Sequence, residues 1–141
     1  MSKKLSLLLA IILVASLLLS ACGTGGGEST FKACQVTDTG GIDDKSFNAT
    51  AWKGVEDAVD ELGIEGKYLE SQQQTDYEKN INAFLEEECD LIITVGFLLG
   101  DATAAAAEAN PDVDFSIVDF AYDPAIDNVL GQVFNTDEAA F

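Results

Sequence analysis

Short apolar runs of strand length alternate with segments of helical period from Phe31 onward. The run at residues 91–95, Leu-Ile-Ile-Thr-Val, is nearly continuous, which is typical of a parallel strand buried on both faces. Residues 46–62 instead place apolar side chains on one face of a helix and acidic side chains on the other, and Trp52 is expected in the core. Because strands and helices alternate, the sequence predicts an α/β fold, a doubly wound parallel sheet covered by helices.

Local signals mark the ends of several predicted elements. Ser46 is expected to cap the first helix and Gly63 to end it, while Thr75 and Glu78 have the spacing of a capping box for the second helix. Residues 136–141 have the pattern of a helix that has only begun, so we expect the chain to be the N-terminal part of a longer protein. The predicted strands are residues 32–37, 66–70, 91–95, 115–119 and 129–134, and the predicted helices are residues 46–62, a segment from about residue 75, and residues 100–109.

The start of the chain has the order of a secretory signal. Two lysines precede an apolar run at residues 5–19, which is shorter than the roughly 20 residues that a membrane-spanning helix needs. The sequence Leu-Ser-Ala-Cys that follows resembles the lipobox of bacterial lipoproteins, in which the cysteine receives a diacylglyceryl group. We therefore expect a signal peptide at residues 1–21, a lipid on Cys22, a flexible glycine-rich tether at residues 22–30 and a folded lobe at residues 31–141. The alternative is an ordinary signal peptide in which the cysteine carries no lipid.

The charge balance argues against several function classes. The chain has 25 acidic residues against seven lysines, no arginine, no histidine and a formal net charge of −18. Nucleic acid repels such a chain, and histidine, the commonest general base, is missing. The Asp38-Thr39-Gly40 string occurs once, whereas aspartic proteases need two, and Asp43 and Asp44 lack the spacing of a calcium loop and are expected to be solvated. We expect a protein that is not an enzyme and uses no cofactor and no metal ion.

The candidate binding residues follow the predicted strands, because ligands of open parallel sheets bind outside the carboxyl ends of the strands. Carboxylates, an asparagine and aromatic rings suit a ligand with a flat apolar part and several hydroxyl groups, such as a nucleoside or a sugar-like solute. Phe120 and Tyr122 lie near the same edge. Structural roles remain open for Asp38 as a turn residue, Asn48 as a helix cap and Phe47 as a hydrophobic staple. The candidate residues are Asp38, Phe47, Asn48, Gly96, Phe97 and Asp119.

Residues 37–48 and 51–54 closely resemble the opening of the basic membrane protein family, the nucleoside-binding lipoproteins of ABC importers. Residues 67–71, 89–99, 110–113 and 118–119 are similar to later segments of that family, in the same order. The resemblance implies a two-lobed fold of the periplasmic-binding-protein type I, in which each lobe is a doubly wound sheet and the lobes close on a purine or other nucleoside. It also implies that this chain holds most of the first lobe only.

The resemblance assigns a role to each candidate residue. It implies that Asp38 hydrogen-bonds the ribose or the base edge, that Phe47 stacks on the base, that Asn48 assists, and that Asp119 grips the ribose hydroxyl groups. Gly96 and Phe97 would line the wall of the site. The implied partners are a nucleoside and the permease subunits of an ABC importer, and the implied location is the extracytoplasmic face of the cell membrane, where the protein is anchored by lipid. The alternatives are a membrane-tethered ligand sensor of the same fold and a binder of another small polar solute such as a sugar.

The two cysteines of the folded part are expected to form a disulfide. Cys34 lies near the start of the first predicted strand and Cys89 just before the third, and these strands are parallel neighbours in a sheet of order 2-1-3-4-5. Neighbouring strands lie about 4.8 Å apart, within the roughly 4.4–6.8 Å between Cα atoms that a disulfide spans, and an exported protein meets oxidising conditions. The alternative is a pair of buried thiols, because strand side chains alternate between faces.

Overall fold

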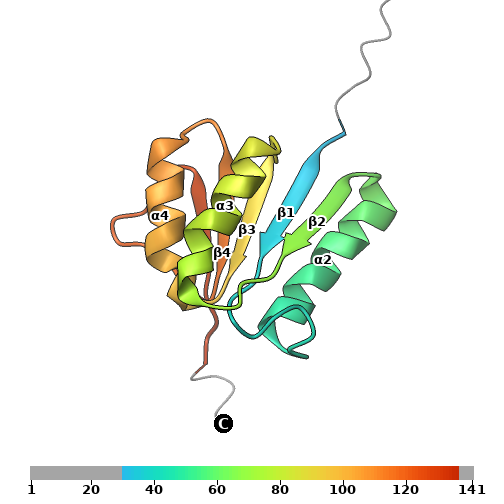
Figure 1. Ribbon diagram of the computed structural model, residues 1–141, viewed down its shortest axis with the longest axis horizontal. Coiled ribbons are helices and arrows are strands. Elements are labelled where there is room, and N and C mark those ends of the chain that lie inside the picture. The colour runs from blue at the N-terminus through green and yellow to red at the C-terminus, as the bar shows by residue number, and fades with distance from the viewer. Residues whose placement is uncertain (1–29, 137–141) are drawn as a thin grey trace, which may run out of the picture.

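A computed structural model of the chain describes residues 30–136. The predicted signal peptide, the predicted lipid site at Cys22, most of the predicted tether and residues 137–141 of the predicted last helix lie outside the described residues. The described part contains a five-stranded sheet of order β2-β1-β3-β4-β5, and every pair of neighbouring strands is parallel (Figure 1). The predicted doubly wound α/β fold and its strand order are therefore confirmed.

The elements fall close to their predicted positions. The helix at residues 100–109 and the strand at residues 91–95 match, whereas the last strand ends two residues earlier than predicted. Within residues 30–136, no helix is long and apolar enough to cross a membrane. The elements are β1 (Lys32–Val36), α2 (Phe47–Leu62), β2 (Glu65–Leu69), α3 (Tyr77–Glu86), β3 (Leu91–Val95), α4 (Gly100–Ala109), β4 (Asp114–Val118) and β5 (Val129–Gln132).

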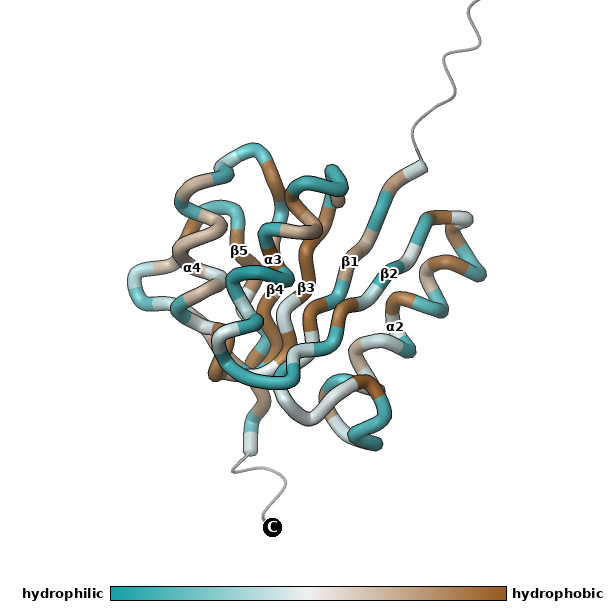
Figure 2. The backbone as a smooth tube through the Cα atoms, in the orientation of Figure 1, coloured by the Kyte–Doolittle hydropathy of each residue, from teal (hydrophilic) through white to brown (hydrophobic). Residues whose placement is uncertain are grey.

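The two faces of the sheet differ in their cover. Strand side chains alternate, so Cys34, Ile92 and Phe115 belong to the buried cluster beneath α3 and α4, while Ala33 and Ile93 face α2. The central strands β3 and β4 are mostly hydrophobic along their length, and the surface loops are mostly hydrophilic (Figure 2). The main core of the described residues therefore lies between the sheet and the helix pair α3 and α4.

The two ends of α2 are held by different means. Gly63 ends the helix as predicted, with a φ of 69° and its N–H donated to the Val59 carbonyl at 3.0 Å. The expected Ser46 cap is wrong, because the Ser46 side chain makes no capping hydrogen bond. The Asp44 carboxylate takes that role instead, since its Oδ1 accepts the backbone N–H groups of Ser46 at 2.8 Å and Ala49 at 3.0 Å. The expectation that Asp44 is merely solvated is therefore wrong as well.

Two other local expectations fail for identifiable reasons. The capping box of Thr75 and Glu78 does not form, because residues 74–76 make a 3₁₀ turn and α3 begins at Tyr77 without a side-chain cap. Trp52 is only partly buried rather than in the core, and its ring packs edge-on against Tyr68 with 4.9 Å between ring centroids. Tyr68 belongs to β2, an edge strand, so this aromatic pair lies at the margin of the sheet.

A disulfide joins β1 to the loop between α3 and β3. Cys34 and Cys89 are bonded through sulfur, with 6.2 Å between their Cα atoms, and both side chains are buried. The register pairs Cys34 with Ile92, so Cys89 reaches it from outside the strand ladder rather than as a direct cross-strand neighbour. The bond lies in the core beneath α3, where the side chains of these residues converge.

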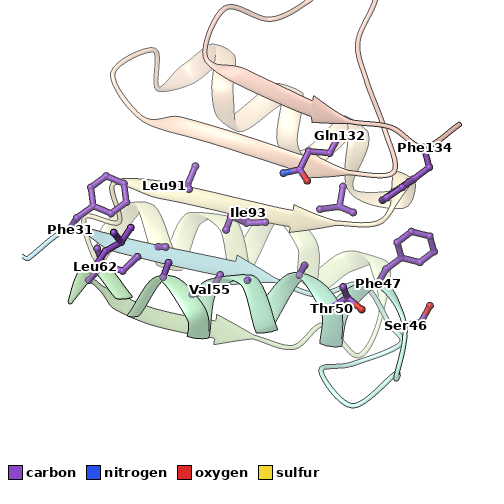
Figure 3. Close-up of a pocket in the computed structure, with 16 residues that line it drawn as sticks. Phe31, Ser46, Phe47, Thr50, Val55, Leu62, Leu91, Ile93, Gln132 and Phe134 are labelled. Carbon is purple, nitrogen blue, oxygen red and sulfur yellow. The ribbon is translucent and has the colours of Figure 1, made fainter. Parts of the chain in front are cut away.

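Helix α2 covers only part of its face of the sheet. An apolar groove of about 750 Å³ runs between α2 and the strands, from Phe31 near one end to Phe47 and Phe134 near the other (Figure 3). Its floor includes Leu91 and Ile93 from the central strand β3. The connection from β4 to β5 contains no helix, so among the described residues nothing else covers this face.

Candidate functional site

Asp38 lies two residues beyond the end of β1, in the loop at the carboxyl edge of the sheet. Its Oδ1 accepts two hydrogen bonds, from the Gly40 backbone N–H at 2.9 Å and from Asn48 Nδ2 at 2.7 Å. The carboxylate is partly exposed, whereas Asn48 is 1% exposed. Two residues that the sequence predicts as candidates are therefore in direct contact, although they are separated by a loop and belong to different elements.

Glycines let the chain approach the Asp38 carboxylate closely. A Cβ atom added to Gly96 would lie 3.1 Å from Asp38 Oδ2, and one added to Gly40 would lie 3.0 Å from Oδ1. Gly96 also has a φ of 103°, a conformation that side-chain-bearing residues rarely adopt. The chain at the end of β3 can therefore approach Asp38 this closely only because residue 96 has no side chain. This explains why glycine stands at this predicted wall position.

Asp44 completes a polar network with Asn48. Its Oδ2 accepts the Asn48 backbone N–H at 3.0 Å and Asn48 Nδ2 at 3.1 Å. Burial raises the pKa of the Asp44 carboxyl, but backbone hydrogen bonds from Ala49, Ser46 and Asn48 and the Asn48 amide outweigh this effect and lower the pKa. Asp44 is thus an ionised hydrogen-bond acceptor at neutral pH.

Two aromatic rings are exposed at the same edge. Phe47 is the first residue of α2 and is 44% exposed, and Phe97 follows β3 and is 59% exposed. The Phe47 ring meets the Phe134 ring edge-on, with 5.5 Å between centroids. Large apolar rings that remain this exposed are available to stack on a flat ligand.

Asp119 follows β4 and has an uncommon backbone conformation. Its φ is 67°, which is a left-handed value for a residue that carries a side chain, and its N–H donates to the Gln132 carbonyl at 2.8 Å. Aspartate is one of the side-chain-bearing residues that adopt this region most readily, and Lys45 and Glu88 have similar values. Asp119 lies at the carboxyl edge with Asp38, but it has no direct hydrogen bond with the Asp38 network.

Phe120 and Tyr122 support α4. The Tyr122 hydroxyl donates to the Gly100 carbonyl at 2.7 Å, and the Phe120 ring packs on Gly100 and edge-on against Tyr122. Burial raises the pKa of Tyr122. These two rings are therefore held by the fold, and Phe47 and Phe97 remain the exposed aromatic candidates.

Two further residues, Glu70 and Tyr77, interact with the loop that contains Asp38. The Glu70 carboxylate accepts the Ile42 backbone N–H at 2.7 Å, which ties the loop to the end of β2. Burial raises the pKa of Tyr77, and the nearby charge of Asp38 raises it further. Neither residue is among the candidate binding residues that the sequence predicts. Glu70 is the last residue of the second predicted strand, so its place at the carboxyl edge was the available signal, whereas Tyr77 comes near the Asp38 charge through the packing of α3.

The site has the composition of a binding site for an organic solute. Within residues 30–136, no group of three His, Cys, Asp or Glu side chains is placed to hold a metal ion. The apolar groove beside α2 includes Phe47 but none of the candidate carboxylates, so it is distinct from the polar network. The hydrogen-bonding groups of Asp38 and Asn48 and the exposed rings of Phe47 and Phe97 lie at the carboxyl edge of the sheet.

A doubly wound parallel sheet with such an edge defines an α/β ligand-binding lobe. The sequence profile of the family described as "ABC transporter substrate-binding protein PnrA-like" matches residues 31–141, so the chain belongs to this family of solute-binding proteins. The family resemblance of the sequence is thereby confirmed.

Relatives and a solved structure agree with this assignment. A Listeria monocytogenes protein named "CD4+ T-cell-stimulating antigen" is 34% identical over 96% of this chain and 42% of its own length. A Lactococcus lactis protein named "ABC transporter nucleoside-binding protein BmpA" is 34% identical over 100% of this chain and 43% of its own length. A crystal structure of ABC transporter solute-binding proteins from Aeropyrum pernix is 31% identical, with a TM-score of 0.72 over 78% of this chain and 30% of that chain. The chain spans about two fifths of the length of these curated relatives.

Proposed function

We propose that the protein is a lipoprotein that captures nucleosides, purine nucleosides above all, for an ABC importer. The observation that carries the proposal is the Asp38–Asn48 hydrogen bond beside the exposed ring of Phe47. A carboxylate accepts hydrogen bonds from ligand hydroxyl or N–H groups, and a ring face stacks on a base, so the combination suits a nucleoside. The name of the Lactococcus lactis relative supports the same ligand class.

Each residue has a proposed role in binding. Asp38 accepts a hydrogen bond from the ribose or the base edge, Phe47 stacks on the base, and Asn48 holds Asp38 and assists. Asp119 binds the ribose hydroxyl groups. It follows directly on the end of β4 and has a left-handed backbone conformation. Gly96 and Phe97 line the wall. The ligand is bound rather than converted, since the site has no histidine and its family consists of solute-binding proteins.

We also propose that the protein works at the extracytoplasmic face of the cell membrane. Residues 1–21 would be removed as a signal peptide, Cys22 would carry the lipid, and residues 22–30 would tether the lobe at residues 31–141. The permease subunits of the importer would be its protein partners. Replacement of Cys22 by serine should release the protein from the membrane fraction, and retention of the variant there would contradict the lipid anchor.

Thermal-shift and calorimetric titrations of the complete natural polypeptide test the ligand class. Adenosine, inosine and uridine should raise the unfolding midpoint as their concentrations exceed the dissociation constant, whereas glucose and free nucleobases should not. A response to sugars alone would replace the nucleoside by a sugar. A protein that binds nucleosides but supports no uptake when the importer is present would instead be a ligand sensor.

A further inference from the structure

The Asn48 amide has one orientation that suits its neighbours. Its Nδ2 lies 2.7 Å from Asp38 Oδ1 and 3.1 Å from Asp44 Oδ2, and an ionised carboxylate only accepts hydrogen bonds. A reversed amide would put the Asn48 carbonyl oxygen against two carboxylate oxygens, with no proton between them. The two carboxylates together therefore fix which end of the amide faces Asp38.

Of these two carboxylates, Asp44 has the firmer support. Its Oδ1 accepts the N–H groups of Ser46 and Ala49, and its Oδ2 accepts the backbone N–H of Asn48, so three backbone bonds hold it at the start of α2. Asp38 is held by one backbone N–H and by the Asn48 amide, both on the same oxygen atom. The backbone at the start of α2 therefore holds Asp44, Asp44 holds the Asn48 amide, and the Asn48 amide holds Asp38.

We infer that Asp44 is a positioning residue of the ligand site, which acts through the Asn48 amide to set the direction of the Asp38 carboxylate. The inference rests on the proposed function, because Asp38 and Asn48 are proposed ligand contacts. Asp44 needs no contact with the ligand for this role. Without the Asp44 carboxylate the Asn48 NH₂ group keeps only Asp38 as an acceptor, so the amide and the Asp38 carboxylate bonded to it are no longer held in one direction from the start of α2.

The first test compares two substitutions that remove the same charge from adjacent residues. In the complete natural polypeptide, Asp44→Asn keeps the side-chain shape but places an NH₂ group among hydrogen-bond donors. Titration calorimetry with adenosine and inosine should show binding weakened about tenfold or more, the scale of a hydrogen bond to a charged group. Asp43→Asn is the matched control, because Asp43 is exposed and makes no hydrogen bond in the described part of the chain. Its affinity should stay within about twofold of the unaltered protein.

The second test follows the Asn48 side-chain NH₂ directly. Its signal in a ¹⁵N NMR spectrum is assigned by its absence in Asn48→Ala. The signal should shift and exchange faster with water in Asp44→Asn, and it should stay unchanged in Asp43→Asn. A residue that only supports the helix would leave this signal in place, while circular dichroism verifies that each variant is folded.

The outcomes separate the inference from the proposed function. Equal nucleoside affinity in Asp44→Asn, or weaker affinity with an unchanged Asn48 signal, overturns the positioning role and leaves the proposed function standing. If the unaltered protein binds no nucleoside, the proposed function fails. The Asn48 signal then decides alone: a shifted signal supports the positioning role, and an unchanged signal overturns it.

Discussion

The Asp44 carboxylate, which caps the start of α2, makes the stability of the protein depend on pH. Its pKa is lowered from an ordinary value of 3.8, so the folded state binds this proton less readily than the unfolded chain does. The contribution of Asp44 to stability is therefore fully present above pH 3.8 and is lost as the pH falls through the lowered value. Asp44→Asn should lower the unfolding midpoint at pH 7, and the gap to the unaltered protein should narrow at about pH 3. Thermal unfolding at both pH values checks this, and an equal gap at both would contradict it.

Gly96 is the second residue whose replacement has a predictable cost. In Gly96→Ala the new methyl group would lie 3.1 Å from Asp38 Oδ2, and alanine would have to adopt a φ of 103°. A strained conformation of this kind costs about 1–3 kcal/mol, so the free energy of unfolding should fall by that amount. Urea denaturation measures the change. Gly54→Ala is the matched control, since a Cβ atom there meets no other atom within 4 Å and alanine favours a helix.

Asp119 offers a direct test of the proposed ligand contacts. Asp119→Ala leaves ligand hydroxyl groups without an acceptor, so the binding free energy should weaken by at least about 1–3 kcal/mol in the complete polypeptide. Titration with purine nucleosides measures the change. Unchanged affinity would remove Asp119 from the site.

Some residues of the candidate site could be predicted from the sequence, and others could not. Asp38 and Asn48 follow from the rule that ligands bind at the carboxyl ends of parallel strands, because the strand pattern locates those ends. Asp44 was misjudged, since an aspartate in a polar loop looks the same in sequence whether it is solvated or accepts four hydrogen bonds. The four-bond pattern depends on how the loop folds back on α2, which residue types alone do not fix.

At the scale of elements, the predictions succeed where a long pattern determines them. Strand Leu91–Val95 and helix Gly100–Ala109 were located correctly, because the first is a nearly continuous apolar run and the second is an alanine-rich segment followed by proline. The start of α3 was not, since Thr75 and Glu78 have the spacing of a capping box but fall where a 3₁₀ turn precedes the helix. The choice between two helix starts depends on a few hydrogen bonds, and tertiary packing decides it.

The disulfide between β1 and the loop before β3 predicts that the stability of the protein depends on redox conditions. It joins residues 55 positions apart, and a cross-link over a loop of that size stabilises a domain by about 2–4 kcal/mol. A reductant should therefore lower the unfolding midpoint of the protein. The Cys34→Ala/Cys89→Ala double variant should not respond to reductant. Intact-mass analysis with an alkylating reagent under denaturing conditions supplies the decisive reading: alkylation of both cysteines without prior reduction would mean that the bond is absent.

At the scale of the whole molecule, the site is open on one side. The Phe47 ring is 44% exposed, so a ligand stacked on it would keep its other face in water within the described part of the chain. We expect residues 31–141 alone to bind nucleosides far more weakly than the complete polypeptide does. Titration of both forms with the same nucleoside checks this expectation, and submicromolar binding by residues 31–141 would refute it.

The sequence predicts a sheet face that is not fully covered, because the helix expected at residues 136–141 has only begun, but it does not locate the apolar groove beside α2. The alternation of elements implies helices on both faces, but only the structure reveals that a single described helix covers the face of Leu91 and Ile93. Exposed apolar surface of this kind is an aggregation liability in any part of a protein that lacks its cover. Purified residues 31–141 should therefore tend to self-associate through this groove.

The direction of β1 separates the point where the chain enters the sheet from the edge that holds the candidate site. The chain enters the sheet at Lys32, and the strand then carries it about 16 Å to the edge where Asp38 lies (Figure 1). A lipid on Cys22 would attach the protein on the entry side, so the candidate site would lie at the end of β1 that is farther from the attachment. Solutes would reach the candidate site by diffusion from the surrounding medium. Delivery to a membrane transporter would then require the lobe to rotate on the tether at residues 22–30, so that the site faces the membrane.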